Sequence, residues 1–182
     1  MTKLKTGVIL VFLLSALSCK EGKKVVMEDP VPVGISTFYF IRHAEKDRSN
    51  PEDQNPELSQ SGLGRAMHWN EIFKDVELDA IYSTDYARTS MTAAPTSVAR
   101  DIDIEYYDPS IIDLEQFKAD NLNKNVLIVG HSDTTPDFVN KVLGEQKYNT
   151  MDDADNGSLF IVQIVNGIPT SQQIHINCNC PK

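Results

Sequence analysis

The chain has 182 residues, a length typical of one globular domain, and 41% of them are hydrophobic. This composition excludes an intrinsically disordered polyelectrolyte and a fibrous repeat. With 17 Lys and Arg against 26 Asp and Glu, the formal net charge is -9, which argues against a protein that binds extended nucleic acid but is compatible with a local basic pocket for one anion. The three cysteines, Cys19, Cys178 and Cys180, fit neither a disulfide-rich scaffold nor a four-ligand zinc pattern.

Residues 1–18 have the pattern of a secretory signal. Lys3 and Lys5 precede an apolar run over 7–14, which is too short for the roughly 20 residues that span a bilayer. A small residue precedes Cys19, so the segment resembles a bacterial lipoprotein signal in which Cys19 becomes the lipidated first residue. Ala16 stands where such signals usually have Leu. The alternative is an ordinary cleaved signal with an incidental Cys19.

Residues 19–34 contain Lys, Gly and Pro without hydrophobic periodicity, which predicts a tether. The folded domain is expected over residues 35–182. Removal of the signal takes away two lysines and lowers the formal charge from -9 to about -11. We therefore expect an extracytoplasmic protein, attached by a lipid anchor to a bacterial membrane on its periplasmic or cell-surface side.

Short apolar runs alternate with amphipathic segments through this domain. They predict strands over 37–41, 79–83, 102–107 and 125–130, and helices over 60–74, 87–100, 111–121 and 135–143. Strands separated by helices predict a three-layer α/β/α fold with a mainly parallel central sheet. Segments 158–165 and 171–177, split by 166–169, predict a C-terminal antiparallel hairpin.

Basic side chains follow three of the predicted strands, where open α/β sheets bind their ligands. Arg42 and His43 follow the first strand, Arg88 the second, and His131 the fourth. Two guanidiniums brought together would repel each other unless an anion lay between them, and Arg matches phosphate bidentately. Two imidazoles would supply a nucleophile and a second donor for phosphoryl transfer. This chemistry requires neither metal nor cofactor, and we expect none.

Four sequence motifs carry a resemblance to a known family. They are RHAEK at 42–46, LSQSGLGRA at 58–66, STDYARTSMTA at 83–93 and VGH at 129–131. Their order resembles the histidine phosphatase superfamily, which includes the cofactor-dependent phosphoglycerate mutases. Ala44 replaces the usual Gly, as in one subgroup that also carries Glu-Lys next.

The resemblance implies a phosphoglycerate mutase-like fold and specific residue roles. His43 would be the nucleophile that becomes phosphohistidine, and Arg42, Arg88 and His131 would bind the phosphoryl group. Water would then attack the phosphohistidine. Ser83 and Thr84 are expected to support the phosphate-binding residues from behind, or to shape the loop, rather than to contact phosphate directly.

The resemblance leaves the general acid open. One branch of the family uses a Glu between the third strand and its helix, and the other an Asp beside the second His. Asp108, Asp113 and Glu115 lie in the first region, whereas Asp133 lies two residues after His131. We favour Asp133 as the acid and expect the others to be N-caps or solvated residues.

Only about 18 residues separate the third and fourth strands, where the mutase-type relatives carry longer insertions. An uncovered pocket exposes the phosphohistidine to water, which favours hydrolysis over mutase transfer. We therefore expect a metal-independent phosphomonoesterase. An alternative is a lipid-anchored protein that binds phosphate or phosphoesters without turnover, and a weaker one is a regulatory module that binds a phosphorylated protein.

The expected substrate is a small phosphorylated molecule or an envelope phosphoglycan. Some minimal members of the family act on the phosphohistidine of cytoplasmic signalling proteins, but the expected location argues against such substrates. The acidic surface mildly favours small substrates over polyanions, and nucleic acid is not an expected partner. The oligomeric state is left open.

Two features near the C-terminus have several interpretations. Cys178 and Cys180 could form a small loop, pair with another chain or stay reduced. The acidic run of Asp152, Asp153 and Asp155 is expected to be a solvated loop rather than a metal site.

Overall fold

The computed structural model describes residues 34–180. The predicted signal, the lipidated Cys19 and nearly all of the predicted tether lie outside these residues. Within the described range, no helix combines the length and hydrophobicity needed to cross a membrane.

The described residues form an α/β fold with one six-stranded sheet. The elements in chain order are β1 (Ile35–Arg42), α1 (Gln60–Ile72), β2 (Ala80–Ser83), α2 (Ala87–Arg100), β3 (Ile104–Tyr106), α3 (Leu114–Asp120), β4 (Asn125–Gly130), α4 (Thr134–Leu143), β5 (Ser158–Val165) and β6 (Ile168–His175). The strand order is β3-β2-β4-β1-β5-β6. The first four strands in this order pair in parallel, and β5 and β6 add antiparallel pairs. The predicted architecture is confirmed.

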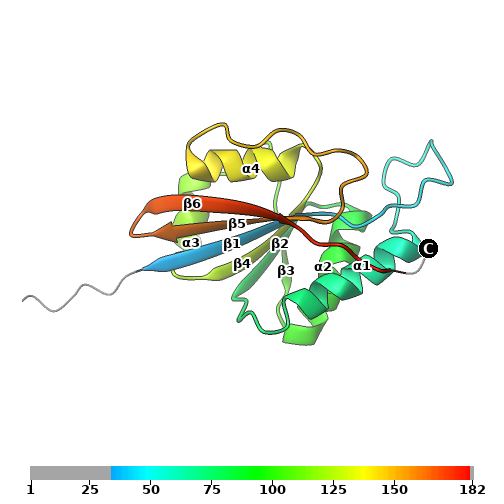
Figure 1. Ribbon diagram of the computed structural model, residues 1–182, viewed down its shortest axis with the longest axis horizontal. Helices are drawn as coiled ribbons and strands as arrows, with labels where there is room; N and C mark the ends of the chain where they lie inside the picture. Colours follow the sequence, from blue (N-terminus) through cyan, green and yellow to red (C-terminus); the bar gives the residue numbers. More distant parts are fainter. Residues whose placement is uncertain (1–33, 181–182) are drawn as a thin grey trace, which may run out of the picture. The chain divides into compact units, whose positions relative to one another are not determined.

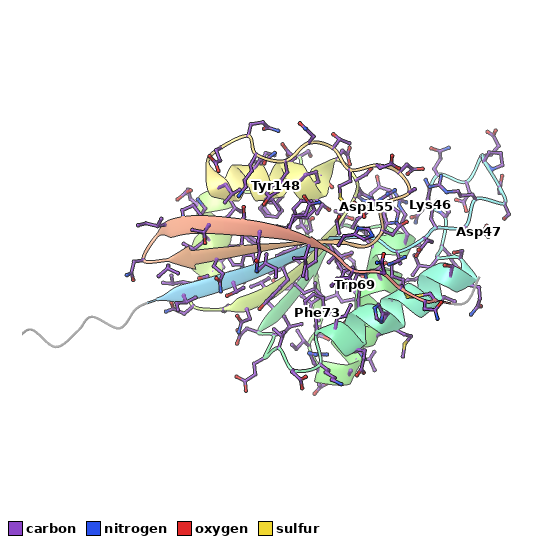
Figure 2. All side chains as sticks on the ribbon, in the orientation of Figure 1. Lys46, Asp47, Trp69, Phe73, Tyr148 and Asp155 are labelled. Atoms are coloured by element: carbon purple, nitrogen blue, oxygen red, sulfur yellow. A yellow bond between two sulfur atoms is a disulfide. The ribbon has the colours of Figure 1, made fainter. Side chains whose placement is uncertain are left out.

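Helices cover both faces of the sheet, with α3 and α4 on one face and α1 and α2 on the other (Figure 1). The alternation of side chains along β1 explains this arrangement, since successive residues of a strand point to opposite faces. Phe38 and Phe40 pack in a core with α3 and α4, whereas Ile41 packs with Trp69 of α1 and with Phe73, which directly follows this helix. Figure 2 shows Trp69 and Phe73 between α1 and the sheet.

Most bounds lie within two residues of the predicted ones, but two elements begin three residues away from their predicted starts. Helix α3 begins at Leu114 rather than Ile111, because the Asp113 carboxylate caps its N-terminus by accepting from the N–H groups of Glu115 and Gln116. Strand β6 begins at Ile168 rather than Ser171, because residues 166 and 167, both with positive φ, form a two-residue turn.

Candidate active site

A pocket of about 750 Å³ opens beyond the carboxyl ends of β1, β2 and β4. All five predicted site residues line it, namely Arg42, His43, Arg88, His131 and Asp133. The parallel pairing of Arg42 with Gly130 explains the convergence, because it places the ends of β1 and β4 side by side. Ser83 does not line the pocket, whereas Thr84 does.

His43 is buried and held in one orientation. Its backbone N–H donates to the Gly130 carbonyl at 2.9 Å, and its Nδ1 lies 2.7 Å from the Ala44 carbonyl. Since a carbonyl can only accept, Nδ1 carries the proton and Nε2 keeps its lone pair. Burial lowers the pKa of His43 from 6.5 to about 3, and the nearby Arg42 contributes to this shift. His43 is therefore a neutral imidazole at neutral pH, with Nε2 available as a nucleophile.

His131 lies against His43, with 5.4 Å between the ring centroids. Its Nε2 is 2.9 Å from the Thr84 hydroxyl, and its Nδ1 is 3.4 Å from Nη2 of Arg88. Burial lowers the pKa of His131 to about 4, and the charge of Arg88 adds to this effect. A second neutral imidazole thus lies beside the nucleophile.

The Thr84 hydroxyl sets the tautomer of His131. It donates to the Thr89 hydroxyl at 3.1 Å, and Thr89 in turn donates to the Thr84 carbonyl at 2.7 Å. The Thr84 oxygen therefore accepts from Nε2–H of His131, which leaves Nδ1 unprotonated toward Arg88. Thr84 was expected to support the site residues or to shape the loop, and its contact with His131 agrees with the first of these roles.

We expect Thr84→Val to lower kcat about tenfold, because it removes the hydrogen bond that orients His131. Thr84→Ser should retain most of the rate. Thr96→Val is the matched control, since Thr96 is buried and its hydroxyl has no hydrogen-bond partner among residues 34–180. Steady-state kinetics of the three variants measure the change in kcat, and thermal melts show whether each variant is folded. Equal rates for Thr84→Val and Thr96→Val would contradict the positioning role.

Stability should fall as the solution becomes acidic. In the unfolded chain both site histidines bind protons near pH 6.5, whereas in the folded protein they do so only near pH 3 and 4. The unfolded state therefore binds more protons in this window. The free energy of unfolding decreases as pH falls from about 6.5 to about 4, by about 1.4 kcal/mol for each pH unit and each of the two histidines.

Denaturant titrations at pH 7 and pH 4.5 measure this dependence. His43→Asn should reduce the loss of stability between the two pH values, and His68→Asn, on α1 and outside the pocket, serves as the control. An unchanged loss in His43→Asn would show that other groups carry the pH dependence.

Both arginines present unpartnered N–H groups. Arg42 is 2% exposed. Its Nη1 donates to the carbonyls of Asp152 and Asp155 at 3.0 and 3.3 Å, and its Nη2 pairs with Asp153 at 2.7 Å. Nε of Arg42, and Nε and Nη1 of Arg88, are buried without a hydrogen-bond partner in the described part of the chain. Buried cationic donors without acceptors indicate that an anion completes the site.

The motif at 58–66 holds the loop that follows His43. Ser59 caps α1, and both its backbone N–H and its hydroxyl donate to the Glu45 carbonyl. Arg65 makes a bidentate ion pair with the Glu45 carboxylate. A Cβ at Gly62 would lie 2.1 Å from the Glu45 carbonyl oxygen, so only glycine permits this close approach. The motif thus supports the nucleophile loop rather than contacting the pocket.

The four acid candidates occupy different environments. Asp133 and Asp108 line the pocket, whereas Asp113 caps α3 and Glu115 lies on α3 beside Lys118. Hydrogen bonds from Ser110 lower the pKa of Asp108, which favours its ionised form. Asp133 accepts from the N–H of Thr134 at the start of α4.

The acidic run has a role that the sequence did not reveal. Asp153 was expected in a solvated loop, but its carboxylate pairs with both Arg42 and Arg48, at 2.7 and 2.6 Å. The same loop places Asn156, whose side chain donates to the His43 carbonyl at 2.8 Å. Cys178 and Cys180 are joined by a disulfide, one of the three states that the sequence allowed.

Comparisons with known proteins agree with the fold and the motifs. The model of the histidine phosphatase superfamily (branch 1) matches residues 38–109, which include three of the four motifs. The resemblance to this superfamily is thereby confirmed over these residues. No curated protein matches the chain.

Several solved structures share the fold. The putative phosphohistidine phosphatase SixA from Agrobacterium tumefaciens has a TM-score of 0.55 and 20% identity, over 79% of this chain and 98% of its own. A protein histidine phosphatase SixA complexed with tungstate has a TM-score of 0.61 and 14% identity, over 76% and 96%. A phosphoglycerate mutase from Bacillus anthracis has a TM-score of 0.56 and 17% identity, over 77% of this chain and 92% of its own. At these identities the likeness concerns the fold.

Proposed function

We propose that this protein is a phosphatase that hydrolyses phosphomonoesters through a phosphohistidine on His43. The observation that carries the proposal is the pairing of a neutral His43, whose Nε2 keeps its lone pair, with two guanidiniums that hold unpartnered N–H groups in the same pocket. A nucleophile and an anion clamp in one pocket are the elements that phosphoryl transfer needs. The superfamily match supports the same class of reaction.

The first step transfers the phosphoryl group to the enzyme. The lone pair of His43 Nε2 attacks phosphorus, and the bond from phosphorus to the ester oxygen breaks. The proton stays on Nδ1 and is donated in a hydrogen bond to the Ala44 carbonyl, which stabilises the positive charge that develops on the ring. The N–H groups of Arg42 and Arg88 stabilise the phosphoryl oxygens. His131 lies beside them, with its Nδ1 facing Arg88 and its Nε2 bonded to Thr84.

The leaving oxygen must receive a proton, and Asp133 is our candidate donor because it lines the pocket near His131. In the second step water attacks phosphorus and gives a proton to the Asp133 carboxylate left by the first step, while the bond to Nε2 breaks and its electron pair returns to the ring. Exposure of the pocket to solvent supports hydrolysis over mutase transfer.

A non-hydrolytic alternative rests on two contacts. Asp153 already pairs with Arg42, and the Asp133 carboxylate, which would serve as the acid, already accepts a hydrogen bond from the Thr134 N–H at the start of α4. A protein with this site could bind phosphate without turnover.

Hydrolysis of p-nitrophenyl phosphate, with and without EDTA, distinguishes the two functions. The phosphatase should release p-nitrophenol at a rate that EDTA does not change. Phosphate binding by calorimetry, without hydrolysis of any ester in a broad panel, would favour the binding protein.

The proposed location is a bacterial membrane on its extracytoplasmic side, through a lipid on Cys19. Cells that express the chain should incorporate labelled palmitate into it, and Cys19→Ser should abolish this incorporation. Incorporation of the label into the Cys19→Ser chain would contradict a lipid anchor on Cys19.

A further inference from the structure

Arg42 and Arg88 together form what we call the phosphate clamp. The other residues that line the pocket carry an excess of negative charge. Four carboxylates line it, which we call the acidic rim: Asp85, Asp108, Asp133 and Asp153. All four residues are exposed. Among the described lining residues other than the two clamp arginines, Lys46 supplies the one permanent positive charge. The acidic rim therefore carries a net negative charge, whereas the clamp is positively charged.

The clamp contains a buried cationic group that can bind an anion. Arg42 is 98% buried, since only 2% of it is exposed, and its Nε lacks a partner among residues 34–180. A phosphate dianion bound there compensates the charges of Arg42 and Arg88. The alcohol part of an ester then faces the acidic rim, with no excess of cation left to neutralise it.

The ion pairs of Asp153 do not remove the net negative charge of the pocket lining. It pairs with Arg42 and with Arg48, so its charge is compensated when phosphate is absent. Even if Asp153 is set aside, three carboxylates face the single ammonium of Lys46. An anionic group on the alcohol would meet net repulsion in either case.

We propose that the acidic rim selects phosphomonoesters whose alcohol is neutral or cationic, and discriminates against esters whose alcohol carries a second anionic group. This rests on the proposed phosphate site of the same pocket. Two unit charges about 8 Å apart in water change an equilibrium about twofold. Three carboxylates opposed by the one charge of Lys46 leave two net negative charges, which together give about a fivefold difference for each unit of charge on the alcohol.

The test compares three phosphate esters of primary alcohols of similar size: phosphocholine, glycerol 3-phosphate and 3-phosphoglycerate. At low ionic strength kcat/KM should decrease in this order, by about fivefold at each step. In 0.5 M NaCl the spread should shrink, because salt screens exposed charges. Equal kcat/KM values, or the reverse order, would overturn the proposal.

The double variant Asp85→Asn, Asp108→Asn should bring the three esters closer together. The control is Asp75→Asn, Asp103→Asn, which makes the same change in net charge at exposed residues outside the pocket and should keep the wild-type spread. A spread that narrows equally in both double variants would show that total charge, and not the acidic rim, is responsible.

A binding measurement separates this proposal from the proposed function. Calorimetry of His43→Ala with the three esters tests the charge preference without turnover. If the wild type hydrolyses no ester but the affinities follow the predicted order, the phosphatase proposal is wrong and the charge selection is supported. If the esters are hydrolysed and neither rates nor affinities differ, the phosphatase is supported and the charge selection is wrong.

Discussion

His43→Ala should abolish phosphatase activity, with a loss of at least about 10⁴-fold in kcat. The loss follows from the geometry, because His43 Nε2 is the ring nitrogen that keeps a lone pair in the clamp, while Nδ1 is committed to the Ala44 carbonyl. His131 cannot take its place, since its Nε2 is bonded to Thr84 and its Nδ1 faces Arg88. Stopped-time assays with p-nitrophenyl phosphate measure the effect.

Phosphate binding provides the internal control for this variant. Arg42 and Arg88 keep their contacts when His43 is truncated, so the affinity for inorganic phosphate should change by less than about threefold, the scale of one weak hydrogen bond. His68→Ala, on α1, should leave the rate unchanged. Residual activity of His43→Ala above one tenth of wild type would assign the nucleophile elsewhere.

Arg88→Ala should lower kcat/KM about 10³-fold, because it removes a guanidinium that faces the developing charge of the transferred group. The buried Nε and Nη1 of Arg88 have no partner in the described residues, and the Tyr86 ring lies 4.4 Å from its guanidinium carbon, which fixes its orientation. Both kcat and KM should be affected, since Arg88 would bind the phosphate in the ground state and in the transition state.

Arg88→Lys should recover only part of this loss, because one ammonium cannot reproduce the planar fork of a guanidinium. Arg100→Lys is the matched control, at the opposite end of α2, and should retain the wild-type rate. Full activity of Arg88→Lys would reduce the role of Arg88 to that of a point charge.

Much of the fold could be predicted from the sequence because the local signals agree with the tertiary structure. The apolar run at 125–130 and the amphipathic segment at 87–100 have the predicted bounds, as β4 and α2. The start of β6 was wrong because Pro169 suggested a longer turn. Strand β6 lies at the edge of the sheet, where a residue without an N–H is tolerated.

The convergence of the two arginines and two histidines was also predictable, since it follows from parallel strands that end at one edge. The pairing of Asp153 with Arg42 was not, because these residues are 111 positions apart and an acidic loop shows no periodic signal. The hydrogen bond between Thr84 and His131 likewise depends on the relative placement of two loops, which sequence spacing does not encode.

Detection of the covalent intermediate tests the central claim most directly. The enzyme would be mixed with ³²P-labelled substrate, quenched within milliseconds in alkali and digested for mass spectrometry. We predict one labelled peptide, phosphorylated on His43, with a linkage that is stable in alkali and lost in acid. Rapid hydrolysis of the substrate without label on His43, or with label on another residue, would contradict the proposed mechanism.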